Sequence, residues 1–215
     1  MTILELRQYT LHPGRRDELI ELFERELVES QEELGARIVG TFRDLADPDR
    51  FVWIREFADM TTRLAALSGF YGGPVWKQHR DAANATMIDF DDVLLLEPVG
   101  AGFPHAPRAA VAAGAPGSSR VLAVVRTGEG LEPAAPDAER LLGARPVVAR
   151  TAPFPNDFGA LPVRDEQAVV WFASYPDSEA ARSARERLDA DPGWQTGATA
   201  VQLLELEPTP RSALR

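Results

Sequence analysis

Charged and aromatic side chains alternate with apolar ones in two short segments near the start of the chain. They are Glu5, Arg7, Tyr9, Trp53 and Arg55. The alternation predicts strands, and successive side chains of a strand point to opposite faces. Glu5, Arg7 and Tyr9 therefore share one face of a sheet, and so do Trp53 and Arg55. Arginines beside a phenol and a carboxylate can bind an organic anion and move a proton at neutral pH.

The apolar side chains at the intervening positions are expected to pack under helices. These residues are Leu4, Leu6, Val52 and Ile54. The charged set would then lie on the open face of the sheet, where it would line a cavity. A further predicted strand, residues 36–45, would add Thr41 and Arg43 to this open face.

A structural role for the charged residues is the alternative. Glu5 on one strand could pair with Arg7 or with Arg55 on the neighbouring strand. A buried arginine needs a partner whatever its function, because an unpaired charge in the interior is costly. The sequence therefore leaves two interpretations open, a ligand site and ion pairs that seal an interface between the halves of the protein.

The segment GFYGGPVWKQHRDAANATM, residues 69–87, collects aromatic side chains around a Gly-Gly-Pro break and then continues as a polar helix. Tyr71 and Trp76 are candidates for contacts with a ligand. His79 lies three residues beyond Trp76 and would serve as a general base near neutral pH. A packing role is the alternative for His79, since no orienting partner lies near it on its own helix face.

Strands and helices are expected in the order β-α-β-β-α-β. The strands are predicted at 3–10, 36–45, 51–57 and 91–99, and the helices at 17–34 and from 60 onward after an Asp59 cap. This order is that of a ferredoxin-like unit, which has helices on one face of its sheet. After a segment rich in glycine, alanine and proline the pattern starts again, with strands predicted at 120–127, 145–151, 168–175 and 200–208.

The two halves share landmarks at a constant spacing of 118 residues. The pairs are Trp53 with Trp171, Asp59 with Asp177, Pro74 with Pro192 and Trp76 with Trp194. Because the chain has only four tryptophans, these matches predict an internal duplication. We therefore expect a first unit at residues 1–99, a linker at 100–119 and a second, divergent unit at 120–210.

The expected fold is α+β, with two tandem ferredoxin-like units whose sheets pack together as an α+β barrel. The open sheet faces would enclose a cavity, with Trp171 on a mostly apolar wall opposite the charged wall of the first unit. Such a cavity suits a small organic anion, for example a carboxylate or a phenolate. Strand edges left open by the units would permit a homodimer.

The composition restricts the class of protein. With 45% hydrophobic and 26% charged residues the chain is typical of soluble globular proteins, and no apolar run approaches the ~20 residues of a membrane span. A net charge of −10 argues against nucleic-acid or anionic-membrane binding. The chain has no cysteine, no histidines at metal-ligand spacing and no phosphate-binding glycine motif. We expect no metal site and a cytoplasmic location.

Two stretches resemble the NIPSNAP family. They are ELRQYTLHPGRRDELIELFERE, with Glu, Arg and Tyr at alternate positions before Pro-Gly and an amphipathic helix, and FVWIREFADMTTRLAALSGFYGGPVWKQH, with an aromatic strand, an acidic cap, Arg63 and Trp76. The resemblance covers residues 3–98 and is looser in the second half. It implies the dimeric α+β-barrel fold group, which includes cofactor-free monooxygenases, dehydratases and isomerases as well as haem proteins. It assigns no catalytic residue to this chain.

Three functions follow as hypotheses. The first is an enzyme of small-molecule metabolism without metal or cofactor, of the monooxygenase, isomerase, cyclase or dehydratase type. Its proton-moving candidates are Tyr9, His79 and Glu5, and its substrate-binding candidates are Arg7, Arg43, Trp53, Arg55, Tyr71, Trp76 and Trp171. The second is a haem protein with His79 as the axial ligand. The third is a binding or scaffold protein without catalysis.

Overall fold

The computed structural model describes residues 1–112, 117–133 and 138–215. The first half contains, in chain order, β1 (Ile3–Leu11), α1 (Arg16–Leu22), the π-helix η1 (Phe23–Leu27), α2 (Glu29–Glu32), β2 (Arg37–Asp44), β3 (Arg50–Phe57), α3 (Met60–Gly72), α4 (Pro74–Asn84) and β4 (Met87–Pro98). The second half contains β5 (Arg120–Thr127), α5 (Ala138–Leu142), β6 (Val147–Thr151), β7 (Ala168–Tyr175), α6 (Ser178–Ala190), the 3-10 helix η2 (Pro192–Gln195) and β8 (Ala200–Pro208).

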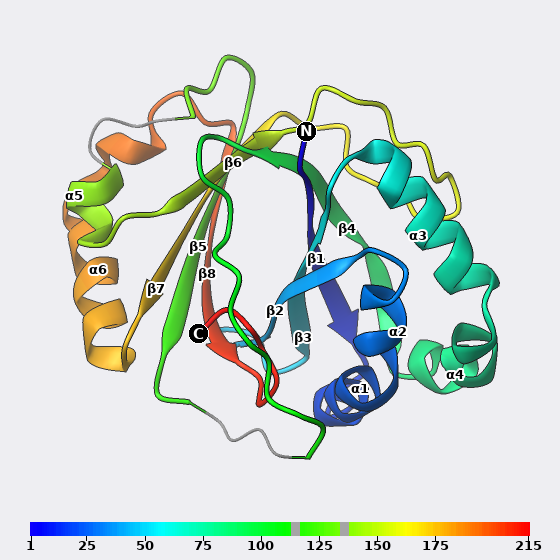
Figure 1. Ribbon diagram of the computed structural model, residues 1–215. Helices are drawn as coiled ribbons and strands as arrows, with labels where there is room; N and C mark the ends of the chain where they lie inside the picture. The colour runs from blue at the N-terminus through cyan, green and yellow to red at the C-terminus, as the bar shows by residue number, and fades with distance from the viewer. Residues whose placement is uncertain (113–116, 134–137) are drawn as a thin grey trace.

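The eight strands of the described residues form one closed antiparallel barrel in the order β1-β3-β2-β8-β5-β7-β6-β4. Within each half the first strand lies between the third and the fourth, as in a ferredoxin-like unit. The halves meet where β2 pairs with β8 and β4 with β6. Helices of the first half cover one side of the barrel, and α5 and α6 cover the other (Figure 1). The predicted α+β barrel of two ferredoxin-like units is confirmed.

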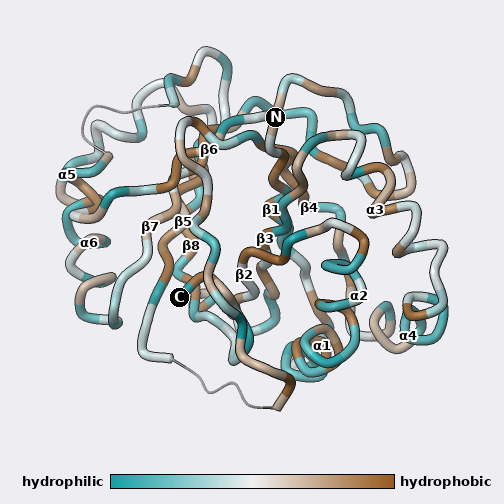
Figure 2. Tube along the Cα trace, viewed as in Figure 1, coloured by the Kyte–Doolittle hydropathy of each residue, from teal (hydrophilic) through white to brown (hydrophobic). Residues whose placement is uncertain are grey.

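The barrel interior is filled by apolar side chains from both halves. They include Leu4, Leu6, Val52 and Ile54 from the first half and Val121, Ala123, Val170 and Leu204 from the second. Hydrophobic residues accordingly follow the strands through the centre of the molecule (Figure 2). The prediction that these leucines pack under helices is wrong, and so is the predicted charged cavity between the sheets. Both faces of each sheet are covered, so alternation along a strand does not reveal which face is inside.

The charged face of β1 and β3 lies under the helices instead. There Tyr9 and Trp53 pack against Phe23 and Leu27 of η1 in an apolar cluster that also includes α1, α3 and α4. The second half has a matching layer in which Trp171 lies against α5 and α6. Trp171 is therefore not on a wall of a central cavity, contrary to the prediction.

Local sequence signals mark several helix ends correctly. Asp59 caps α3 and Asp177 caps α6, each by accepting a hydrogen bond from a backbone N–H, at 2.7 and 2.9 Å. Gly35 has a φ of 95° and ends the first helical segment. That segment, predicted as one helix over 17–34, is divided by η1 into three. No helix in the described residues has both the length and the apolar character needed to cross a membrane.

Because the barrel is closed, the edges of its strands pair with one another within a single chain. Throughout the described residues each strand has a neighbour on both sides in the barrel order. The open edges on which the predicted homodimer rested are therefore absent from this part of the chain. Residues 100–112 and 117–119, between β4 and β5, contain no helix or strand. The predicted bounds of the two units, the linker and the internal duplication stay predictions.

Two segments of the second half reach back over the first. The connection between β6 and β7, residues 152–167, is held to β4 by two backbone hydrogen bonds of 2.9 Å. In Figure 1 this segment is drawn in yellow and runs beside α3. The C-terminal residues 209–215 are held to β2 by backbone hydrogen bonds of 2.9 Å to Thr41 and Val39. The first half is thus supported by chain that lies far away in the sequence.

Candidate functional site

Glu5 of β1 lies at the centre of a group of buried charged side chains. Its carboxylate accepts hydrogen bonds from Arg7 of β1 at 2.9 Å, from Arg55 of β3 at 2.5 and 3.1 Å, and from Arg63 of α3 at 2.7 Å. None of the four side chains is more than 1% exposed. Strand pairing places Glu5 opposite Arg55, and α3 brings Arg63 onto the same face. We call these four residues the Glu5 network.

A second set of side chains, from other parts of the fold, holds the three arginines. Their contacts are Arg55 to Gln31 Oε1 at 2.8 Å, Arg7 Nε to the Tyr9 hydroxyl at 3.0 Å, Arg63 to Asn156 Oδ1 at 3.1 Å, and an ion pair between Arg63 and Asp157. Gln31 belongs to α2, and Asp157 belongs to the 152–167 segment. Asp157 is 26% exposed, so the network reaches solvent at this residue.

The arginines keep Glu5 ionised. Burial by itself raises the pKa of a carboxyl group, but the charges of Arg55, Arg7 and Arg63 outweigh burial and hold the pKa of Glu5 well below its usual value. Glu5 is therefore an anion near neutral pH, which argues against its predicted role as a proton carrier. Burial raises the pKa of Tyr9 above its usual value, so the phenol keeps its proton.

The network has an excess of positive charge and of hydrogen-bond donors. Its three arginines meet one buried carboxylate and the partly exposed carboxylate of Asp157. Arg7 Nη2 and the indole Nε1 of Trp53 are buried and have no acceptor among the described residues. The guanidinium of Arg7 lies 5.4 Å from the ring centroid of Trp53, so both donors belong to one region. Because an unmet buried donor is costly, an anion bound here would be stabilised by both.

Two adjoining cavities lie over this region and share Tyr9, Tyr71, Trp76 and Met87 as lining residues. The larger, which we call the aromatic cavity, has a volume of about 270 Å³ and is also lined by Asn84, Phe90, Phe158, Ala160 and Leu161. The smaller, the inner cavity, has a volume of about 30 Å³ and is also lined by Leu19, Phe23, Leu27, Gln31, Trp53, Phe70 and Ala83. The inner cavity borders the Glu5 network through Gln31 and Trp53.

Tyr9 connects the cavities to the network. Its ring lines both cavities, and its hydroxyl accepts the hydrogen bond from Arg7. The ring also meets Trp53 and Phe90 edge to face, with centroids 5.9 and 6.3 Å apart. Because the Tyr9 oxygen accepts the hydrogen bond from Arg7, the O–H hydrogen of Tyr9 is available to donate to a ligand. The arrangement can bind a flat molecule with an anionic end and donate a proton to it.

The comparison with protein families identifies the family to which the first half of the chain is similar. The NIPSNAP family profile matches residues 4–100, which contain the four strands of the first half apart from Ile3, the first residue of β1. Residues 4–100 match the NIPSNAP domain, and we call them the NIPSNAP unit. No curated protein matches the chain.

Solved structures resemble the chain over its whole length and over the NIPSNAP unit. A proposed monooxygenase from Fusobacterium nucleatum has a TM-score of 0.60 at 9% identity, covering 96% of this chain and 92% of its own. A proposed monooxygenase from Lactobacillus acidophilus has a TM-score of 0.53 at 15% identity, covering 100% and 98%. An uncharacterised NIPSNAP-like domain protein from Burkholderia xenovorans has 24% identity and a TM-score of 0.44, covering 48% and 90%. At these identities the two whole-length likenesses show the fold and not an activity.

Most predicted site residues of the NIPSNAP unit do lie together, on the helix side of the sheet. Glu5, Arg7 and Arg55 belong to the network, and Tyr9, Trp53, Tyr71 and Trp76 line the cavities. Thr41 shares the predicted face but hydrogen-bonds to Thr209 at 2.6 Å, away from the network. The charged side chains are under the helices because α2 and α3 supply their partners, whereas the barrel interior is apolar.

Two further predicted residues of the NIPSNAP unit lie outside the site. Arg43 of β2 pairs with Asp17 of α1 at 2.8 Å. His79 of α4 faces Glu26 of η1, with its Nε2 3.7 Å from the carboxylate, and it lines neither cavity. Its predicted catalytic role thus has no geometric support. For the same reason His79 does not fit as an axial haem ligand in these cavities.

Sequence reasoning did not assign several residues of the site. They are Gln31, Arg63, Asn84, Met87, Phe90, Asn156, Asp157, Phe158 and Leu161. Arg63 had a usable signal, because it lies one helical turn after the Asp59 cap, next to the sheet. The residues of the 152–167 segment had none, since that segment has no periodic pattern. Among the described residues, no group of three or more His, Asp or Glu side chains is arranged to hold a metal ion.

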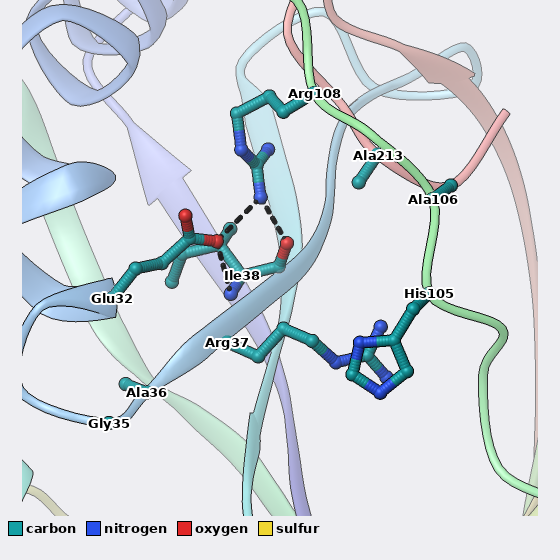
Figure 3. A pocket seen from close by; sticks show the side chains of 9 residues that line it. All are labelled: Glu32, Gly35, Ala36, Arg37, Ile38, His105, Ala106, Arg108 and Ala213. Atoms are coloured by element: carbon teal, nitrogen blue, oxygen red, sulfur yellow. Dashed lines mark hydrogen bonds and ion pairs between the residues drawn. The ribbon is translucent and has the colours of Figure 1, made fainter.

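A separate polar pocket of about 360 Å³ lies between β2, α2 and the connection that follows β4. Figure 3 shows Arg108 reaching Glu32, with Arg37 and His105 together on one side of the pocket. Arg37 already makes two hydrogen bonds to Glu56, at 2.9 and 2.7 Å. Because carboxylates already engage both arginines, this pocket offers an anion less than the site in the NIPSNAP unit.

Glu5→Gln is expected to destabilise the protein by about 3–5 kcal/mol, because it leaves three buried arginines without their anion. Glu5→Gln is to be compared with a variant that carries Glu5→Leu, Arg7→Met, Arg55→Met and Arg63→Met, which we call the apolar-network variant. Replacing a whole buried ion cluster by apolar side chains is often neutral or stabilising. Urea unfolding should therefore give this variant a clearly higher free energy of unfolding than Glu5→Gln. The reverse order would contradict the central role of Glu5.

The low pKa of Glu5 also predicts how stability depends on pH. Below its ordinary pKa of 4.5, the unfolded chain binds a proton at Glu5 and the folded chain does not. The stabilisation from Glu5 is thus complete above that pH and is lost as the pH falls, at about 1.4 kcal/mol per pH unit. Urea unfolding between about pH 5.5 and 3.5 should show a steeper loss for the wild type than for the apolar-network variant. Parallel losses would mean that Glu5 titrates normally in the folded protein.

Proposed function

We propose that the NIPSNAP unit binds a small planar organic anion and acts on it by proton transfer, without a metal or bound cofactor. The ring of the ligand would lie in the aromatic cavity, against the walls formed by Tyr71, Trp76 and Phe158. Its carboxylate or phenolate would point to the inner cavity. Trp53 lines the inner cavity, and Arg7 lies next to its ring. Trp53 Nε1 and Arg7 Nη2 are both donors without an acceptor among the described residues.

The observation that carries this proposal is the second half of the same chain. Strand pairing places Arg7 opposite Trp53 in the first half and Val124 opposite Trp171 in the second. By this pairing Glu5 corresponds to Leu122, Arg7 to Val124 and Arg55 to Ala173, and the spacing of 118 residues matches Arg63 with Ala181. All four counterparts are apolar. These apolar residues complete the same layer between sheet and helices. The fold therefore does not require four buried charges at this place. Since a buried ion cluster is no more stabilising on average than apolar packing, a ligand is the better explanation for it.

Tyr9 is the proposed proton donor. Its buried hydroxyl is protonated before a ligand binds, because burial raises its pKa. Arg7 donates to the same oxygen and would stabilise the phenolate formed when the proton is given up. Glu5 stays ionised and keeps the arginines in place. This assignment suits isomerisation, enolisation or dehydration, in which an oxygen of the substrate gains negative charge during the reaction.

Oxygenation is a second type of reaction for such a site. The names of the Fusobacterium and Lactobacillus proteins point to it, at 9% and 15% identity. No arrangement of the described residues favours oxygenation over proton transfer. Proton transfer is preferred because Tyr9 and Arg7 form a matched donor and charge stabiliser at the end of the cavity.

Titration with 2-naphthoate, and with 2-naphthalenemethanol as its neutral counterpart, tests the proposed binding. The wild type is expected to bind the anion at least about tenfold more tightly, since only the anion gains a charge-assisted hydrogen bond from Arg7. The apolar-network variant should lose this preference while circular dichroism shows that it keeps its fold. Arg43→Met is the matched control, because Arg43 pairs with Asp17 outside the site. If the wild type has no preference, or if Arg43→Met loses it as well, the proposed site is wrong.

Tyr9→Phe tests the role of the phenol separately from the arginines. It removes a hydrogen bond to the bound anion and leaves the ring in place, so we expect the affinity for 2-naphthoate to fall about tenfold. Calorimetry measures the change. An affinity equal to that of the wild type would show that the hydroxyl does not contact the ligand, and Tyr9 would then be a wall residue only.

A further inference from the structure

One wall of the aromatic cavity comes from the second half of the chain. Phe158, Ala160 and Leu161 line it together with residues of the NIPSNAP unit. They belong to the 152–167 segment between β6 and β7, which lies outside the residues matched by the family profile. Phe158 and Leu161 also pack in one apolar cluster with α3. The site is therefore not complete within the NIPSNAP unit.

The segment is anchored to the Glu5 network by side chains. Asp157 forms an ion pair with Arg63. Asn156 accepts a hydrogen bond from Arg63 at 3.1 Å and closes a turn by donating to a backbone carbonyl five residues later at 2.8 Å. Phe158 lies within this turn and stacks on Tyr71, with ring centroids 5.9 Å apart and planes inclined by 28°. The position of Phe158 is thus coupled to an arginine of the network.

Asp157 acts through position and not through contact with a ligand. It lines neither the aromatic nor the inner cavity. Its side chain is 26% exposed, whereas Arg63 and Glu5 are completely buried. The ion pair between Asp157 and Arg63 therefore joins the solvent-exposed segment to the buried charges. Without this ion pair, Arg63 would be linked to the turn that carries Phe158 only through Asn156.

We propose that the 152–167 segment determines which anions the site accepts, with Phe158 as the specificity-determining residue and Asp157 as the residue that positions it. This inference rests on the proposed binding site and adds its size limit. The aromatic cavity, at about 270 Å³, is near the lower end of small-molecule sites. Phe158 closes one side of it, so the accepted ligands are short, flat aromatic anions.

Calorimetric titration with 2-naphthoate and the longer 4-biphenylcarboxylate tests the size limit. Phe158→Ala opens one wall and is expected to shift the ratio of the two affinities toward the longer anion by about tenfold. Phe154→Ala is the matched control, because Phe154 lies in the same segment, is 40% exposed and lines neither cavity. Asp157→Asn should shift the ratio in the same direction, and Asp157→Glu, which keeps the charge, should preserve the wild-type ratio.

The outcomes distinguish this inference from the proposed function. If the wild type binds neither anion, the proposed site is wrong and the inference with it. If the wild type binds 2-naphthoate but Phe158→Ala changes the ratio no more than Phe154→Ala, only the specificity role is overturned. Equal ratios for Asp157→Asn and Asp157→Glu would overturn the positioning role of the Asp157 charge. Phe158→Leu, which shortens the side chain and keeps it apolar, gives the same comparison if the alanine variant does not fold.

Discussion

The first half of the chain is organised around one buried negative charge. Three arginines removed from water would each carry a large desolvation penalty, and the carboxylate of Glu5 makes their burial possible. Its hydrogen bonds fix strands β1 and β3 against helix α3, and the amide of Gln31 adds α2. The aromatic residues follow from the same constraint, because the guanidinium groups of Arg7 and Arg55 lie 5.4 and 5.0 Å from the ring centroid of Trp53. The cavities lie where this aromatic layer meets the helices.

The two halves build the same layer with different chemistry, and the differences are more informative about function than the similarities. Trp171 donates its indole N–H to a backbone carbonyl at 3.2 Å, while the indole N–H of Trp53 has no acceptor among the described residues. Trp194 is buried and donates to a backbone carbonyl at 2.8 Å, while Trp76 is half-buried and lines both cavities. A residue that only stabilises the fold in the second half is thus free to form a wall of the site in the first.

Local signals made much of this fold predictable from the sequence. Alternation identified the strands and grouped Glu5 with Arg7, and acidic caps located the start of α3 and α6. The face of the sheet could not be predicted, because the leucines of β1 and the charged residues between them are both buried, and only tertiary partners decide which side holds charge. For His79, helical periodicity predicts the face of the helix on which it lies. It does not predict which residue packs opposite that face, which is Glu26 in the structure. The contact of Arg63 with Asp157 joins positions 94 residues apart and leaves no local pattern.

The second half also supports the site from the helix side. Glu24 of η1 accepts hydrogen bonds from the Thr209 hydroxyl at 2.6 Å and from the Arg211 backbone N–H at 2.8 Å. A π-helix is a rare geometry that occurs frequently at functional sites, and here the C-terminal residues hold it through its buried carboxylate. Phe23 and Leu27, at its two ends, both line the inner cavity. The C-terminal residues thus stabilise a helix that lines part of the inner cavity, and the segment after β6 supplies one wall of the aromatic cavity. A NIPSNAP unit alone would lack both supports, so the second half contributes to the site although it carries none of the arginines of the network.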